Sequence, residues 1–154
     1  MGSEISGGIR NVTIRSCLMD NENWSTLRFK SQPSRGGTVE NITFEDITIK
    51  GARSIFDINM EWRMVPPLSP AHYPLTCLRN IHFKNINGEA QSAGTMYGFK
   101  EAPFGNDTFF FENCHIKAQK GLSISNVANV NFKGLELEIK EGEKIYERSA
   151  NKDK

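Results

Sequence analysis

One pattern of alternating apolar and polar residues recurs along the chain. Each copy has apolar residues at its second, fourth and seventh positions, a polar or outward residue at its third, and usually asparagine at its first. The five copies are Asn11–Cys17, Asn41–Ile47, Asn80–Ile86, Thr108–Cys114 and Asn129–Leu135. A period of two predicts a β-strand with one buried face, so each copy is expected to form one strand.

A second predicted strand follows the first four copies, at residues 25–30, 54–59, 96–100 and 121–125. Because the copies begin at residues 11, 41, 80, 108 and 129, their spacing is that of a solenoid. Equivalent strands of successive coils would pair in parallel, and equivalent asparagines could hydrogen-bond to one another or cap a turn. The sequence therefore predicts an all-β fold, a parallel β-helix of about four to five coils over residues 1–139. A charged tail that we expect to fray follows at residues 140–154.

One insertion interrupts the repeat between the second and third copies. Residues 60–76 contain four prolines, which exclude regular structure there. Loops that project from a rigid scaffold often carry binding residues, so this loop is a candidate for part of a site.

Composition and charge narrow the classes of function. The 154 residues suffice for one domain, and the net charge of +1 gives no global attraction to nucleic acid or membrane. No apolar run is long enough to cross a bilayer, and the first residues show no signal peptide. The three cysteines, Cys17, Cys77 and Cys114, lack CxxC spacing, which argues against a disulfide framework or a metal site. Two of them occupy the inward seventh position of the repeat.

Several segments resemble the family 28 glycoside hydrolases, the polygalacturonase group. The similar stretches are residues 2–12, 27–31, 35–37 and 39–44, and the family's Arg-Ile-Lys signature matches Arg28-Phe29-Lys30 with phenylalanine at the inward position. The resemblance extends over roughly residues 2–139. It implies a right-handed parallel β-helix that hydrolyses galacturonic acid linkages in cell-wall pectin with inversion. It also implies a secreted or periplasmic location and no metal or organic cofactor.

The family's catalytic motifs are missing from this sequence. They are Asn-Thr-Asp, an Asp-Asp pair and Gly-His-Gly, and no aspartate or histidine here lies in such a context. Inverting glycosidases need two carboxyl groups flanking the bond, so we identify no catalytic residue. We expect the chain to begin just after the catalytic centre and to be inactive alone. Asp57 and Glu61 are the nearest acids in the next coil, and a salt bridge or an outward surface charge is the favoured role for them.

Four residues are candidates for substrate binding. Arg28 and Lys30 lie two apart on a predicted strand and share its outward face, where two cations suit a galacturonate carboxylate. A solvated strand face is the alternative. Trp62 could pack against a sugar ring or anchor the loop. Tyr97, with Lys100, could line a distal subsite. His72 and Tyr73 belong to the same loop as Trp62, whereas His82 and His115 are expected to be surface residues.

Two functional hypotheses remain open at this stage. The first is an incomplete glycosidase that is inactive by itself. The second is a non-catalytic β-helix module that holds an acidic glycan on Arg28, Lys30 and Trp62. In both, the N-terminal coil of a severed solenoid would expose strand edges and apolar surface. We therefore expect the chain to be marginally stable or to associate through that end, with another copy or with an N-terminal half.

Overall fold

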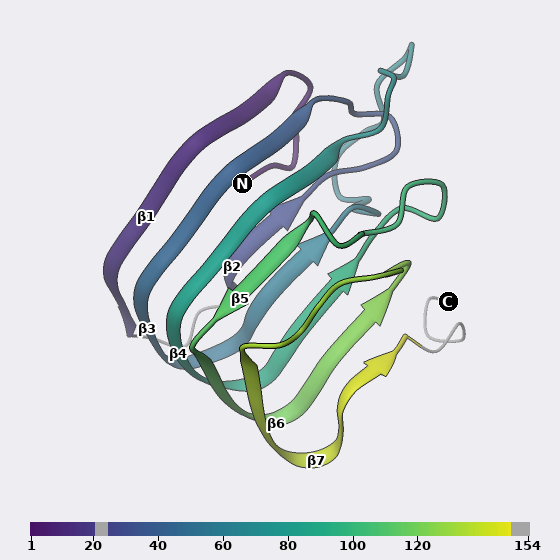
Figure 1. The fold of residues 1–154 in the computed structure, drawn as a ribbon. Coiled ribbons are helices and arrows are strands. Elements are labelled where there is room, and N and C mark those ends of the chain that lie inside the picture. The colour runs from purple at the N-terminus through teal and green to yellow at the C-terminus, as the bar shows by residue number, and fades with distance from the viewer. Residues whose placement is uncertain (21–24, 149–154) are drawn as a thin grey trace.

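The computed structural model describes residues 1–20 and 25–148, and this part of the chain is all β with no helix. It is the parallel β-helix that the sequence predicts, with the right-handed course implied by the family resemblance (Figure 1). The strands are β1 (Gly8–Asp20), β2 (Ser25–Lys30), β3 (Thr38–Asn59), β4 (Cys77–Tyr97), β5 (Phe109–Glu112), β6 (Cys114–Ser125) and β7 (Leu135–Glu147).

All strand pairs are parallel, and they join successive coils rather than neighbouring segments of sequence. The order is β1-β3-β4-β6-β7, with β2 paired to β3 and β5 paired to β4. The register keeps the repeat aligned, because Ile14 pairs with Phe44 and Phe44 pairs with Phe83. The described residues thus form five coils, in which each strand of one coil hydrogen-bonds to the equivalent strand of the next.

The boundaries of several strands differ from the expectation. Within β3 and β4 the repeat strand continues into the second strand without a break, so each coil bends rather than stops at its corner. β4 ends at Tyr97, short of the expected Lys100. The fifth copy of the repeat forms a turn, in which Asn131 Oδ1 accepts a hydrogen bond from the Lys133 N–H, and β7 begins only at Leu135.

The expected boundary at residue 139 lies inside a strand. β7 continues to Glu147 and pairs with β6 on both sides of a register shift near Lys120. Residues 140–147, which the sequence placed in a tail, are therefore part of the sheet. Residues 149–154 of that expected tail lie outside the described part of the chain.

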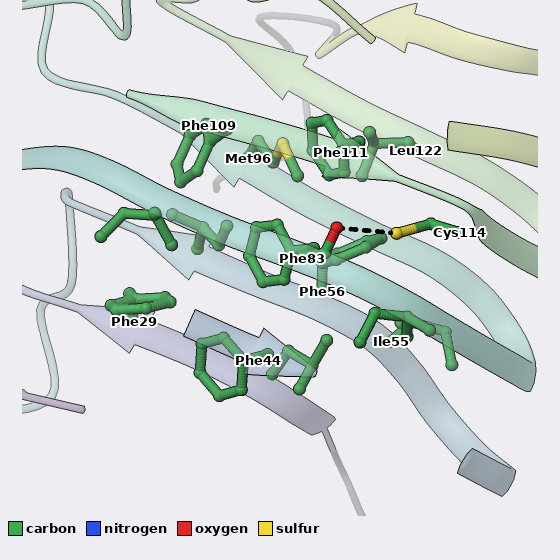
Figure 2. Close-up of a cluster of buried hydrophobic side chains, with 14 of the residues drawn as sticks. Phe29, Phe44, Ile55, Phe56, Phe83, Met96, Phe109, Phe111, Cys114 and Leu122 are labelled. Carbon is green, nitrogen blue, oxygen red and sulfur yellow. Dashed lines mark hydrogen bonds between the residues drawn. The ribbon is translucent and has the colours of Figure 1, made fainter. Parts of the chain in front are cut away.

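The core is a stack of phenylalanines along the axis of the helix (Figure 2). Phe44, Phe83 and Phe111 occupy the fourth position of successive repeats, with ring centroids 5.5 Å and 5.3 Å apart and nearly parallel planes. Phe56, which lies in the second strand segment of its coil, packs edge to face against Phe83, with the two ring centroids 5.1 Å apart. Each buried phenylalanine contributes roughly 1.5–3 kcal/mol, so this stack is a main source of stability.

The three cysteines differ in exposure. Cys114 is buried and its thiol donates to the Phe83 carbonyl at 3.2 Å, as Figure 2 shows. Burial raises the pKa of this thiol above its ordinary value, which keeps it protonated and unreactive. Cys17 is partly buried and Cys77 is exposed, and all three are free thiols.

The described residues contain no helix long and apolar enough to cross a membrane. They also contain no group of three histidine, cysteine, aspartate or glutamate side chains placed to hold a metal ion.

Candidate functional site

Strand β2 presents two cations, Arg28 and Lys30, on the outer surface of the β-helix. Leu27 and Phe29 are fully buried, so Arg28 and Lys30 project outward, as the alternation predicts. In the register with β3, Arg28 lies beside Asp57 and Lys30 lies beside Asn59. The local fold therefore places both cations on a flat, hydrogen-bonded surface rather than on a mobile loop.

Arg28 and Asp57 form an ion pair. Arg28 Nε lies 2.7 Å from Asp57 Oδ2, and the two side chains are 32% and 19% exposed. The buried Nε atom makes no hydrogen bond of good geometry, so the contact is electrostatic. Asp57 thus forms a salt bridge, one of the two roles that the sequence favoured for it. Among the described residues Lys30 belongs to no ion pair.

Trp62 lies next to both cations. The Arg28 guanidinium carbon is 4.9 Å from the centroid of the indole ring, and Lys30 Nζ is 4.5 Å from it. Both distances are within the range of cation–π attraction. The structure therefore brings together three of the four predicted binding residues, and this group of Arg28, Lys30 and Trp62 is called the cationic site below.

A buried polar network holds the loop that carries Trp62. The Trp62 N–H donates to the Ser31 carbonyl at 2.8 Å, directly after Lys30. The hydroxyl of Thr76, at the C-terminal end of the loop, lies 2.7 Å from the hydroxyl of Ser31, and both residues are buried. Ser34 Oγ accepts from the Leu68 N–H at 2.9 Å. Because buried polar groups are stable only when they are paired, this network fixes the loop against residues 31–36.

Tyr97 lies two strands away from the cationic site. Across the sheet, Lys30 of β2 pairs with Asn59 of β3, and Asn59 pairs with Tyr97 of β4. The strand that carries Tyr97 is therefore about 10 Å from β2. The Tyr97 hydroxyl donates to Ser123 Oγ at 3.0 Å, and the Arg148 guanidinium lies 4.5 Å from the centroid of the Tyr97 ring. The Arg148 guanidinium thus lies over the Tyr97 ring, and the role of Tyr97 in a distal subsite stays a prediction.

Arg148 also reaches the start of the insertion loop. Its Nη1 lies 3.3 Å from Glu61 Oε2, although the two residues are 87 positions apart in sequence. This contact places Glu61 in an ion pair, one of the two roles favoured for it. Sequence reasoning missed Arg148 because it lies in the segment expected to fray.

The remaining candidates lie elsewhere. Lys100 is exposed beyond the end of β4, and His72 and Tyr73 are exposed toward the C-terminal end of the insertion loop. His82 is half-buried and its ring stacks on Phe110 with centroids 4.9 Å apart. Burial, with a smaller effect from Lys84, lowers the pKa of His82. His115 lies between Asn113 and Glu136, 2.9 Å from an oxygen of each.

These features define a parallel β-helix with a cationic and aromatic site on one outer face, a class suited to binding an acidic ligand. The model of the glycosyl hydrolases family 28 matches residues 1–136, and the chain belongs to this family. It is thus part of the polygalacturonase group of glycoside hydrolases. Neither the comparison with curated proteins nor that with solved structures gives a match.

Proposed function

We propose that this chain takes part in the inverting hydrolysis of galacturonic acid linkages in pectic polysaccharide, and that its cationic site binds a galacturonate unit. Membership of family 28 supports a glycosidic substrate. The observation that carries the proposal is the placement of Arg28 and Lys30 within 5 Å of one tryptophan ring on an outer strand face. A galacturonate unit has both a carboxylate for the cations and a C–H surface for the ring.

The three side chains have different roles in this proposal. Arginine can hold a carboxylate with two parallel hydrogen bonds, whereas lysine acts as a point charge. Arg28 already shares its charge with Asp57, so Lys30 contributes more of the attraction. Trp62 packs against the sugar ring and limits the positions that the two cations can adopt.

The first prediction concerns binding of trigalacturonate, measured by calorimetric titration at low salt. Lys30→Ala should weaken binding about tenfold, which corresponds to ~1.4 kcal/mol. Arg28→Ala should weaken it less, because Asp57 offsets part of that charge. Arg15→Ala, which removes an exposed arginine from β1, is the matched control and should have no effect. Equal affinities for all four proteins would contradict the proposal.

The second prediction concerns hydrolysis. An inverting mechanism needs one carboxylic acid and one carboxylate on opposite sides of the bond. The two acids nearest the site, Asp57 and Glu61, are each in an ion pair with an arginine. We therefore propose that the 154-residue chain alone releases no reducing sugar from polygalacturonate. Activity that disappears in Asp57→Asn and Glu61→Gln, but persists in Asp46→Asn, would contradict this and assign the catalytic pair.

A non-catalytic module that holds an acidic glycan is the second candidate. The ion pairs of Asp57 and Glu61 favour this candidate. Because both nearby carboxylates are paired with arginines, the cationic site can bind a ligand but has no pair of carboxyl groups for catalysis. The two candidates differ in one mixing experiment. A separate chain carrying the family's Asn-Thr-Asp, Asp-Asp and Gly-His-Gly motifs should restore hydrolysis if this chain is part of the enzyme. It should leave binding without hydrolysis if the chain is a module.

A further inference from the structure

The insertion loop lines a hollow that shares Trp62 with the cationic site. Its volume is about 250 Å³, and it is lined by Gln32, Pro33, Glu61, Trp62, Arg63, Val65 and Pro67. We call it the loop pocket. The loop lies between the end of β3 and the start of β4, where the chain extends beyond the strands (Figure 1). Since Trp62 belongs to both, the loop pocket and the cationic site are adjacent.

The walls of the loop pocket are held in place before any ligand binds. Gln32 is 5% exposed, and its amide donates to the carbonyls of Val65 at 3.0 Å and Pro66 at 3.3 Å. Its oxygen accepts from Ser34 Oγ at 3.0 Å. Proline limits the freedom of the backbone at residues 33 and 67. A pocket with fixed walls loses little conformational entropy on binding.

The lining combines apolar carbon with one available charge. Pro33, Val65 and Pro67 supply the apolar surface beside the indole. The carboxylate of Glu61 is paired with Arg148, while Arg63 is exposed at the edge of the pocket. A pyranose ring with an apolar C–H face and a single carboxylate matches this lining. The volume is below the roughly 300 Å³ at which pockets for drug-sized ligands begin, so it suits one sugar unit.

We propose that the loop pocket binds the sugar unit next to the one held by the cationic site, with Arg63 paired to its carboxylate. The inference rests on the proposed function and deepens it. The ligand that uses both places is an acidic oligosaccharide of two or more uronic acid units. The insertion then extends the recognised length of the ligand by one unit beyond the strand surface.

The test compares mono-, di- and trigalacturonate in calorimetric titrations at low salt. The unmodified chain should bind the disaccharide about tenfold more tightly than the monosaccharide. Arg63→Ala should remove that gain and leave the affinity for the monosaccharide unchanged. Arg63→Lys should retain part of the gain because it keeps the charge. Arg15→Ala is the control for loss of an exposed arginine far from the loop.

The outcomes separate the two proposals. If Lys30→Ala weakens binding of every ligand but Arg63→Ala leaves the gain from one unit to two intact, only the loop pocket assignment is overturned. If Arg63→Ala weakens the monosaccharide as much as the disaccharide, Arg63 belongs to the first unit and the assignment also fails. If none of the three sugars binds the unmodified chain, or Lys30→Ala changes nothing, the proposed function itself is overturned.

Discussion

Individual asparagines organise the corners of this β-helix. Asn41 Nδ2 donates to Asn11 Oδ1 at 3.0 Å, and Asn80 Nδ2 donates to Asn41 Oδ1 at 2.7 Å. The same residues have positive φ, close to 56° at Asn41. This left-handed conformation is costly for most residues but is tolerated by asparagine. Each asparagine therefore turns the backbone and also links its coil to the next.

Substitutions at Asn41 can separate these two roles. Asn41→Gly loses both ladder hydrogen bonds, each worth about 0.5–1.5 kcal/mol, but keeps the turn. Asn41→Ala loses the same bonds and adds roughly 1–2 kcal/mol for a non-glycine residue in the left-handed region. We expect both variants to unfold at lower urea concentration, and alanine to be the worse of the two. Equal midpoints would show that the turn imposes no conformational cost at this position.

The sequence predicted the asparagine ladder at the first position of the repeat but not a second ladder at the sixth position. The first position of the repeat is asparagine in four of five copies, so stacking of these side chains could be inferred. The sixth position holds Ser16, Asp46, Asn85 and Asn113 in the first four copies, and these too have positive φ. Asn85 bonds to Asp46 and Asn113 to Asn85, both at 2.8 Å. Mixed residue types concealed a shared conformation that only the backbone reveals.

At the scale of elements, Glu40 connects three strands. It projects from β3 and accepts hydrogen bonds from Arg10 of β1 and Arg79 of β4, each at 2.5 Å. The bond from Arg10, followed by that from Arg79, lowers the pKa of this carboxyl. Three adjacent strands are thus joined by side chains as well as by their backbone ladder.

This arrangement predicts a loss of stability in acid. A carboxyl with a lowered folded-state pKa stabilises the fold above its ordinary value of 4.5, and the contribution is lost as the pH falls through the lowered pKa. The stability difference between the unmodified chain and Glu40→Gln should therefore be largest near neutral pH and shrink below about pH 4.5. Urea midpoints across this range measure it, and added salt should reduce it.

Glu45→Gln is the matched control for Glu40→Gln, since it removes a second outward glutamate of the same strand. It should cost less stability at neutral pH, because in the described part of the chain no arginine side chain donates a hydrogen bond to Glu45 as Arg10 and Arg79 do to Glu40. A stability difference for Glu40→Gln that stays constant from neutral pH to pH 3 would contradict the assigned role.

The elements also show where sequence reasoning ends. Alternation located the repeat strands of the first four coils and placed Arg28 and Lys30 on one face. It could not foresee that β3 and β4 continue through their corners, because a bend of positive φ does not interrupt the ladder. Nor could it place Trp62 over the two cations. That contact depends on hydrogen bonds such as the one between Ser31 and Thr76, which join residues 45 positions apart.

At the scale of the whole molecule, the two ends of the described solenoid differ. The inward residues of β1, including Val12 and Ile14, are only partly buried, whereas their partners Ile42 and Phe44 are 0% and 5% exposed. The edge of β1 is therefore both apolar and open to pairing. β7, at the opposite end, also leaves inward residues such as Leu135 and Ile139 partly buried. It differs from β1 in its charge, because it carries five glutamates, Glu136, Glu138, Glu141, Glu143 and Glu147, and charged residues of this kind discourage edge-to-edge association.

We therefore predict that the isolated 154-residue chain self-associates through β1. Leu18 is 61% exposed on this strand, so Leu18→Lys should place a charge on the contact and lower the average mass measured by sedimentation velocity. Tyr73→Lys makes the same change at an 81% exposed residue of the insertion loop, and should leave the mass unchanged. Circular dichroism would verify that both variants keep the β-helix. If the unmodified chain stays monomeric at its highest soluble concentration, the exposed β1 strand does not drive self-association. That result would contradict the premise that partial burial of the β1 face leaves enough apolar surface to bind a second copy.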